Sequence, residues 1–426
     1  MLTHEQNELL TRTGAGMPLG ELMRRYWIPV LLADELPENN CPPVRVTLLG
    51  ERLLAWRDSA GRYALTDEFC AHRRVSLWFG RNEDGGLRCP YHGWKYDHTG
   101  QCIEVPSEPQ ETGFCTRIRL RSCPLIERGG ILWAYPGPDG HAPPPPTFEW
   151  AEVPAGHRYH SKRLQECNWL QAMEGAIDSS HVSFLHSGDL HRDPLHRDTQ
   201  GARYQQDRRP HFEVVPSPGG FHVGARRSAE AGHWYWRISQ WIMPFFTMVP
   251  PYGDNALNAH AFVPIDDGSC FVWTFTYHPV RPLTAAELEV MRGGGGIHTP
   301  LIPGSFRPVI NRDNDYMMDR AAQKAGRTYS GVSGIAAQDA SIQESMGAVQ
   351  DRTRENLVST DNAIIMARSA LRKAAQALAS GVEPPGRTAA SQRVRSATFV
   401  LPEGVRFTDA RGADLTVREG LSHTSI

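Results

Sequence analysis

The sequence predicts an α+β fold with two domains, a small antiparallel β domain and a larger domain whose antiparallel sheet is flanked by helices. Residues 43–135 contain short apolar or alternating runs separated by Gly, Asp and Asn, a pattern typical of antiparallel strands. After residue 149, strand-like runs alternate with helical patterns at 166–186 and 355–380. Four consecutive prolines at 143–146 separate the two regions, because proline cannot donate the hydrogen bonds of a sheet.

These observations predict three segments along the chain. Residues 43–147 are expected to form the small β domain, and residues 148–426 the larger domain. Residues 1–42 are expected to form a helical arm that packs on the larger domain. A chain of 426 residues exceeds the usual size of one domain, so two separate cores are the natural expectation.

Composition argues against several classes of partner. Lys and Arg total 45 against 47 Asp and Glu, without a long run of either sign, so the chain offers no strong attraction for nucleic acid or an anionic membrane. The first ten residues, MLTHEQNELL, do not resemble a secretion signal, and no stretch is apolar enough for a transmembrane helix. Eight cysteines without regular pairing suggest reduced thiols. The sequence therefore predicts a cytoplasmic protein.

A pair of short motifs combines thiols with imidazoles. Cys70-Ala-His72 is followed, after sixteen residues, by Cys89-Pro-Tyr-His92. Four such ligands could hold zinc, or a [2Fe-2S] cluster with two Cys on one iron and two His on the other. Each motif contributes one Cys and then one His, and the surrounding β pattern fits poorly with a zinc finger, so the cluster is favoured. The other cysteines are singly placed and are expected to be buried apolar residues: Cys41, Cys102, Cys115, Cys123, Cys167 and Cys270.

A second group of ligand-type residues lies in the larger domain. Glu174, Asp178 and His181 fall on one face of the helix predicted at 166–186, and His186 follows about one turn later. Alone, this pattern fits a solvated helix face equally well. Two histidines and one carboxylate would suit a mononuclear Fe(II) with open coordination positions. The candidates for the carboxylate are Asp178 and the distant Asp339, with Asp351 and Glu344 as alternatives.

These motifs resemble those of a known enzyme family. The stretches EFCAHRR and CPYHGWKYDHTGQC resemble the Rieske motif of non-haem iron ring-hydroxylating oxygenases. The pattern from Glu174 to His186 resembles the iron motif of their large (alpha) subunits, and residues 338–356 resemble the phthalate and phenoxybenzoate dioxygenase branch. The small domain is then a Rieske [2Fe-2S] domain and the larger one the catalytic mononuclear iron domain.

The resemblance also implies roles for individual residues. It assigns a Rieske cluster to Cys70, His72, Cys89 and His92, and a mononuclear Fe(II) to His181, His186 and Asp339. It gives Asp178 a catalytic role as the bridge between His181 of one subunit and His92 of its neighbour, within a homotrimer or stacked trimers.

The activity implied by the resemblance is that of the terminal oxygenase of a two-component system. Such an enzyme hydroxylates, by cis-dihydroxylation, an aromatic carboxylate such as a phthalate-like compound. It uses O2 and electrons that come from NADH through a separate flavin and iron–sulfur reductase, which fits a chain without a flavin or nicotinamide fingerprint. Two alternatives stay open: a monooxygenase or O-demethylase of a related aromatic acid, and an electron carrier without catalytic iron.

Arginines are the expected contacts of a carboxylate substrate, because a guanidinium matches a carboxylate with two parallel hydrogen bonds. Arg237 lies among aromatic residues in HWYWRISQWIMPFF, whereas Arg208 and Arg209 resemble a region where phthalate oxygenases place a second substrate arginine. Structural ion pairs are an equally good interpretation of all three. Five further histidines in polar sequence are expected to face solvent: His98, His157, His160, His191 and His196.

Overall fold

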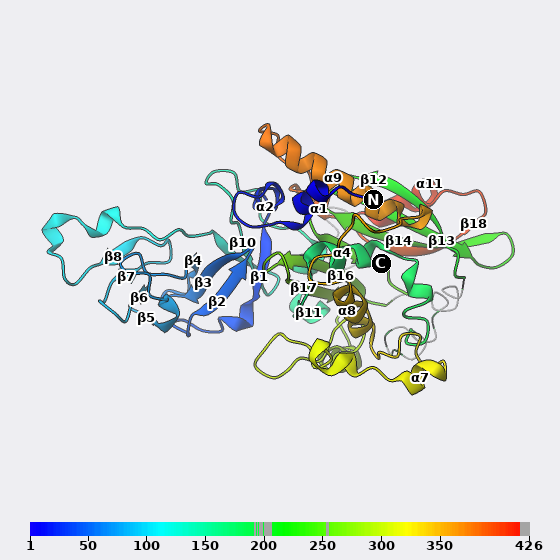
Figure 1. Cartoon of the computed structure of the whole chain (residues 1–426), viewed down its shortest axis with the longest axis horizontal. Coiled ribbons are helices and arrows are strands. Elements are labelled where there is room, and N and C mark those ends of the chain that lie inside the picture. Colours follow the sequence, from blue (N-terminus) through cyan, green and yellow to red (C-terminus); the bar gives the residue numbers. More distant parts are fainter. Residues whose placement is uncertain (191–192, 194, 196–198, 200–206, 253–254, 418–426) are drawn as a thin grey trace. The chain divides into compact units, whose positions relative to one another are not determined.

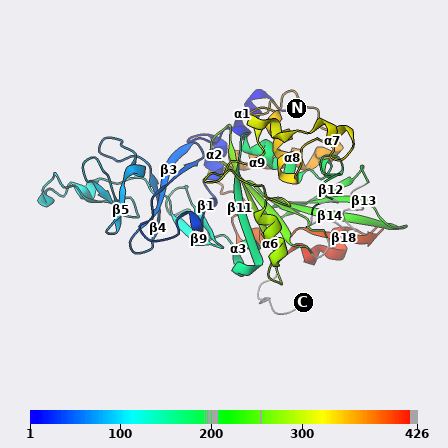
Figure 2. The ribbon, with the colours of Figure 1, turned by 90° about the horizontal axis from the view of Figure 1, so that it is seen from below.

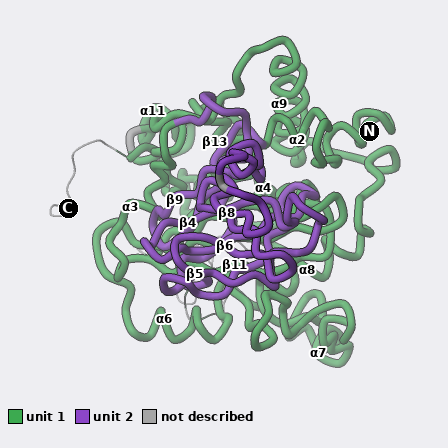
Figure 3. The backbone as a smooth tube through the Cα atoms, turned by 90° about the vertical axis from the view of Figure 1, so that its left-hand side faces the viewer, with its two compact units in different colours: residues 1–23, 144–426 green, residues 24–143 purple. Residues whose placement is uncertain are grey.

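The structure is a computed structural model of the chain (Figure 1), and it describes residues 1–190, 193, 195, 199, 207–252 and 255–417. The chain divides into two compact units (Figure 3). The smaller unit comprises Arg24–Pro143, and the larger unit comprises Met1–Met23 together with Pro144–Ile426.

The smaller unit consists of three antiparallel sheets with the strand orders β1-β10-β9, β2-β3-β4 and β5-β6-β7-β8. Their strands are short, as the alternating runs predict. The bounds are β1 (Ile28–Leu32), β2 (Val44–Leu48), β3 (Glu51–Arg57), β4 (Tyr63–Asp67), β5 (Arg81–Glu83), β6 (Gly86–Arg88), β7 (Lys95–Tyr96), β8 (Cys102–Glu104), β9 (Leu125–Arg128) and β10 (Ile131–Ala134).

The start of the smaller unit depends on a long-range strand pairing. Ile28 of β1 is the antiparallel partner of Ala134 in β10, so the chain joins this unit from Arg24 onward rather than from residue 43. The unit ends at Pro143, within the proline run.

The larger unit is built on an eight-stranded antiparallel sheet. Its order is β11-β17-β16-β15-β14-β13-β12, with β18 paired to β14. The strands are β11 (Arg158–Gln165), β12 (His211–Ser217), β13 (Gly220–Ser228), β14 (His233–Ile242), β15 (Phe246–Val249), β16 (Leu257–Pro264), β17 (Cys270–Tyr277) and β18 (Ala397–Pro402). The central strands β14, β16 and β17 are buried along most of their length, so both faces of the sheet are covered.

Helices complete the larger unit. They are α1 (His4–Thr11), α2 (Pro18–Met23), α3 (Glu149–Glu152), α4 (Trp169–Ile177), α6 (Ala285–Arg292), α7 (Arg320–Lys324), α8 (Ile335–Ser345), α9 (Asn362–Ala379), α10 (Ala389–Gln392) and α11 (Phe407–Arg411). Helix α4 packs on β15 and β16, and Figure 2 shows α8 and α9 on one side of the sheet. The α+β fold predicted from the sequence is confirmed. No helix in the described part of the chain is long and apolar enough to cross a membrane.

Helix α4 is shorter than the helix predicted at 166–186. It begins after Asn168, whose side chain accepts a hydrogen bond from the Leu170 amide, and it ends at Ile177. There Asp178 Oδ1 accepts a hydrogen bond from the Ser180 amide at 2.7 Å. Because this local side-chain bond competes with the next turn of the helix, the chain leaves α4 before it reaches the histidines.

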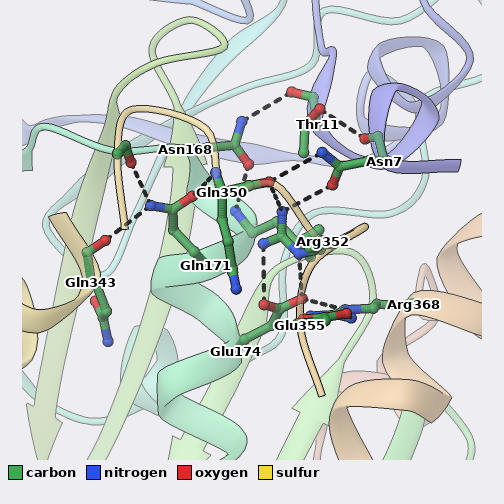
Figure 4. Close-up of polar contacts among 12 residues, drawn as sticks. Asn7, Thr11, Asn168, Gln171, Glu174, Gln343, Gln350, Arg352, Glu355 and Arg368 are labelled. Atoms are coloured by element: carbon green, nitrogen blue, oxygen red, sulfur yellow. Dashed lines mark hydrogen bonds and ion pairs between the residues drawn. The ribbon is translucent and has the colours of Figure 1, made fainter. Parts of the chain in front are cut away.

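A buried polar network joins α4 to distant parts of the larger unit (Figure 4). Glu174 of α4 accepts hydrogen bonds from Arg352 at 3.1 Å and from Arg368 of α9 at 2.7 Å. Arg368 also pairs with Glu355, and Arg352 contacts Asn7 Oδ1 of α1 at 3.3 Å. All four charged side chains are less than a tenth exposed, so each depends on its partners for stabilisation.

Replacing Arg352 by Ala is expected to lower the free energy of unfolding by about 3 kcal/mol, because it removes one of the two cations that neutralise buried Glu174. Urea unfolding followed by circular dichroism measures the effect. Arg354→Ala, at an exposed arginine of the same segment, is the matched control and should change stability by less than about 0.5 kcal/mol. Equal stabilities of the two variants would show that the network adds little.

Candidate active site

Three ligand-type side chains of the larger unit converge beside α4. His181 and His186 follow α4, and Asp339 lies on α8. The Nε2 atoms of the two histidines are 3.2 Å apart, and Asp339 Oδ1 lies 3.6 Å from His181 Nε2 and 3.3 Å from His186 Nε2. Ligand atoms at right angles around a metal, each about 2.1 Å from it, would be about 3 Å apart. The three residues could therefore hold one metal ion on one face, leaving its other positions open.

Polar contacts on the far side of each imidazole favour metal binding through Nε2. His186 Nδ1 lies 2.7 Å from Gln338 Oε1, and because an amide oxygen can only accept, Nδ1 carries the proton. The Gln338 amide group in turn donates to Asp189 and, at 2.9 Å, to the Val332 carbonyl. His181 Nδ1 faces Asp178 Oδ2 at 3.6 Å. Such outer contacts fix the tautomer and the orientation of a ligand imidazole.

The residues of this group shift one another's pKa values. Burial alone would raise the pKa of Asp339, but His186 and His181 lower it to about 2. Burial would lower the pKa of His181, but Asp178 and Asp339 raise it to about 8. Burial would likewise raise the pKa of Asp178, which its contact with His181 keeps below the usual value. Both carboxylates are therefore ionised at neutral pH, as binding a cation requires.

The two alternative carboxylates have other partners. Glu344 accepts hydrogen bonds from the Glu166 amide at 3.0 Å and from the Tyr316 hydroxyl at 2.6 Å. Asp351 is exposed and accepts from Thr353. Neither belongs to the group formed by the histidines, whereas Asp339 does.

A mostly apolar cavity opens beside this centre, between the sheet and helices α4 and α8. Its lining includes His181, His186, Asp178 and Asp339 together with aliphatic and aromatic residues, Val182, Leu190, Val249, Pro250, Tyr252, Phe262, Val272, Ile297 and Ile335. An apolar pocket with a few convergent polar groups is typical of a site for a small organic molecule.

Arg237 is the predicted substrate arginine that the structure places in this cavity. It lies on β14, is 4% exposed, and its guanidinium carbon is 4.2 Å from the centre of the Tyr252 ring. Its Nη2 donates to the Pro250 carbonyl at 3.3 Å, whereas buried Nη1 has no hydrogen-bond partner among the described residues.

Arg208 and Arg209 are not brought to the cavity. Both are exposed, and Arg208 lies over the Phe184 ring at 5.1 Å. Three of the five remaining histidines, His98, His157 and His160, are partly buried rather than solvent-facing. His191 and His196 lie outside the described residues.

Several residues of the site were missed by the sequence analysis. Gln338 immediately precedes Asp339, but only the fold shows that it contacts His186. Arg163 of β11 lines the cavity, and burial lowers its pKa. His260 of β16 also lines it, and burial lowers the pKa of this imidazole to about 4, so it is neutral. Arg163 and His260 belong to strands without any motif, so no local signal identifies them.

The two Cys–His motifs of the smaller unit form loops with the same backbone pattern. The Cys70 amide donates to the Val75 carbonyl at 2.9 Å, and the Cys89 amide donates to the Trp94 carbonyl at 2.8 Å. In each loop the fourth residue after the cysteine donates back to the cysteine carbonyl and has a positive φ, 60° at Arg74 and 76° at Gly93. The loops are therefore matched turns, as the paired motifs predict.

This pair of loops separates thiols from imidazoles. Cys70 and Cys89 are buried, and burial and then the neighbouring Cys70 thiol raise the pKa of Cys89. His72 and His92 are exposed, with ring centres 4.5 Å apart, and His72 stacks on Trp94. A thiol pair behind an imidazole pair fits a [2Fe-2S] cluster with two ligands of each kind. The Tyr96 hydroxyl lies 3.2 Å from Cys70 Sγ, where it could donate to a thiolate.

The other cysteines are also free thiols. Cys115 is partly exposed. The other five are buried as expected: Cys41, Cys102, Cys123, Cys167 and Cys270.

Replacing Gln338 by Leu is expected to weaken Fe(II) binding by about 10- to 100-fold, because His186 loses the acceptor that holds its Nδ1 proton. Competition with a chelator under anaerobic conditions measures the affinity, and circular dichroism verifies the fold. Gln376→Leu, at an exposed glutamine of α9, is the control and should bind Fe(II) normally. Full affinity in the Gln338 variant would show that the hydrogen bond does not support the metal centre.

Comparison with known proteins assigns both units. Residues 26–124 match the Rieske [2Fe-2S] domain, and residues 134–412 match the family described as LigXa C-terminal domain like. The chain is 36% identical to the 3-chlorobenzoate-3,4-dioxygenase oxygenase subunit of Comamonas testosteroni, covering 95% of this chain and 96% of the relative. It is 35% identical to the phthalate 4,5-dioxygenase oxygenase subunit of Pseudomonas putida, covering 96% and 94%.

More distant relatives share the same architecture. The 5,5'-dehydrodivanillate O-demethylase oxygenase subunit of a Sphingobium strain is 29% identical over 90% of this chain and 83% of its own length. Among solved structures, a mutant of NdmA from Pseudomonas putida CBB5 with theobromine has a TM-score of 0.59 at 21% identity, covering 91% of this chain and 99% of that one. Dicamba monooxygenase has a TM-score of 0.57 at 20% identity, covering 84% and 98%. The full-length matches show that this chain belongs to the family of Rieske ring-hydroxylating oxygenase large subunits.

Proposed function

We propose that this chain is the terminal oxygenase component of a two-component system that hydroxylates an aromatic carboxylate, such as a phthalate-like compound, by cis-dihydroxylation. The main observation behind the proposal is that His181, His186 and Asp339 converge at an apolar cavity that also contains a buried arginine. Relatives named as phthalate and chlorobenzoate dioxygenase subunits support this choice of substrate class.

In this proposal each metal group has its own set of ligands. Cys70, His72, Cys89 and His92 would hold the [2Fe-2S] cluster, and His181, His186 and Asp339 the mononuclear Fe(II). The cluster supplies one-electron transfer when bound, and the iron supplies a site for O2 next to the substrate. The chain itself contributes the imidazole tautomers, set by Gln338 and Asp178, and a cavity whose apolar lining excludes water.

Arg237 is proposed to orient the substrate. Its Nη1 points into a buried region without a partner, so a substrate carboxylate would supply the missing acceptor. The ring would then lie against the apolar lining near Asp339 and the two histidines. An arginine that already stacks on Tyr252 is preorganised, which reduces the entropy lost on binding.

Asp178 is proposed to connect the metal centre to the cluster of a neighbouring subunit in a homotrimer or in stacked trimers. It contacts His181 without belonging to the group of metal ligands, and about a quarter of its side chain is exposed, so an outside group can reach it. His72 and His92 are exposed too. Their imidazoles can thus meet a carboxylate of another chain.

We place the electron source in a separate NADH-linked reductase and the protein in the cytoplasm. The family assignment as an oxygenase subunit supports a separate donor. The free thiols of all eight cysteines are compatible with a reducing compartment.

Metal and sulfide analysis of the anaerobically purified protein tests this assignment. Two cluster irons plus one mononuclear iron, with two sulfides per chain and a Rieske-type EPR signal after reduction, are expected. Zinc without sulfide would refute the proposal. Cluster iron alone, after anaerobic incubation with Fe(II), would instead favour an electron carrier.

Replacing Asp178 by Asn is expected to leave both metal groups bound but to slow product formation by roughly 10- to 100-fold, because the bridging carboxylate is lost. Single-turnover product formation and the metal content are measured together. Asp351→Asn changes an exposed aspartate bonded only to its own turn and should retain full turnover. Unchanged turnover in the Asp178 variant would contradict the bridge.

A monooxygenase or O-demethylase acting on a related aromatic acid is the second candidate, and the O-demethylase relative favours it. Both reactions can use the same metal ligands. Product analysis with labelled O2 separates them, because a cis-diol retains two labelled oxygen atoms and a ring monooxygenation product retains one, whereas O-demethylation transfers the label to formaldehyde and leaves none in the aromatic product.

A further inference from the structure

Arg163 is a second buried arginine at the substrate cavity, in addition to Arg237. It lies on β11, is 7% exposed, and lines the same cavity. Its Nη1 donates to Gln165 Oε1 at 2.7 Å, whereas its buried Nε has no hydrogen-bond partner among the described residues. Burying a cation without an anionic partner is costly, so a residue of this kind requires an explanation.

The surroundings of Arg163 do not neutralise it by direct contact. Asp339 and Glu344 act on it through space, but no described carboxylate forms an ion pair with its guanidinium. Asp339 is directed toward His181 and His186 instead. Its hydrogen-bond partner among the described residues, Gln165, is neutral and is itself bonded to Gln343 at 2.6 Å. The guanidinium therefore retains donors for an anion that enters the cavity.

Arg163 and Arg237 approach the cavity from different ends. In the sheet, Arg163 of β11 pairs with Val272 of β17, and Val272 pairs with Phe262 of β16. Strand β15 lies next, followed by β14, which carries Arg237. Arg237 therefore lies four strands away from Arg163, and the strand registers also displace it by several residues along the strand direction. Their positions on well-separated strands suit two acidic groups that are held apart on the ligand.

The charges around the cavity also favour a ligand with two acidic groups. Among the described residues that line it, Arg163 and Arg237 are cationic, and Asp178 and Asp339 are anionic, so their formal charges cancel. A ferrous ion at the three-residue centre adds two positive charges. A substrate with two ionised acidic groups would restore neutrality in this poorly solvated space.

We infer that Arg163 is a specificity-determining residue and that the cavity takes an aromatic compound with acidic groups at two separated ends. One acidic group meets Arg237 and the other meets Arg163, with the ring held between them. This inference rests on the proposed function, because it assumes that this cavity receives the substrate, and it refines the phthalate-like class toward acids whose carboxylates lie far apart.

The test is isothermal titration calorimetry on the anaerobic, oxidised holoprotein, in which no turnover occurs. The probes are benzoate, phthalate, terephthalate and biphenyl-4,4'-dicarboxylate. The wild-type protein is expected to bind at least one of the two separated diacids more tightly than benzoate. Replacing Arg163 by Met should lower the affinity for that diacid by about 30-fold or more, because one partner of a buried charge pair is lost. The affinity for benzoate should remain almost unchanged.

Stability separates a binding role from a structural one. Arg163→Met removes an unpaired buried cation, so the ligand-free protein should unfold at the same temperature or a higher one. Arg163→Lys should restore part of the diacid affinity, because it retains the charge without the two parallel hydrogen bonds. Arg354→Met, at an exposed arginine of the same unit, is the control and should leave all four affinities unchanged.

The outcomes distinguish this inference from the proposed function. Arg163 would have a structural role if its replacement weakened the binding of benzoate and the diacids equally. The same would follow if the variant unfolded at a lower temperature without a change in ligand preference. Tightest binding of phthalate independent of Arg163 would also overturn the inference while leaving an aromatic carboxylate as substrate. Failure of the wild-type protein to bind any of the four acids would instead reject the proposed function.

Discussion

The contact of Glu174 with Arg352 and Arg368 holds the helix from which the metal centre extends. A buried carboxylate is unstable unless cations and donors surround it, and here the two arginines come from segments far along the chain. The network thereby fixes α4 against α9 and the segment around residue 352. Gly175 of α4 lies against the Gln343 side chain of α8, whose Nε2 would be 2.2 Å from a Cβ at this position. This close packing brings Asp339 within reach of the two histidines.

The local parts of both sites could be predicted from the sequence. Cys70 and His72, like Cys89 and His92, lie within single loops, so their spacing indicates ligand pairs. His181 and His186 are five residues apart and are visible as candidates, although their pattern alone fits a solvated helix face equally well. Asp339 is different, because nothing local links it to the histidines. Only the resemblance to the family indicates Asp339, and the packing of α8 on α4 brings it to the two histidines.

The remaining differences arise where tertiary contacts override local pattern. The helix predicted to reach residue 186 ends at Ile177, because Asp178 bonds to the Ser180 amide. The smaller unit begins at Arg24, because β1 pairs with a strand about a hundred residues later. Arg163 carries no signal in the mostly polar sequence of β11. It becomes notable only when the fold shows that it is buried, lacks an ion pair and faces a cavity.

Two cavities share Asp178, His181 and Asp339, and their linings differ in a way that suits two tasks. The first contains Arg163, Arg237 and apolar side chains, whereas the second includes the ion pair of Arg368 with Glu355. In the second, Arg368 is already neutralised by Glu174 and Glu355, so an incoming anion would gain little there. In the first, neither Arg163 nor Arg237 forms an ion pair with a described residue, so both retain donors for an anion. An anionic ligand that bound only the folded chain at this cavity would also stabilise the larger unit. The charge of the substrate and the charge of the cavity would thus together determine how tightly this site binds.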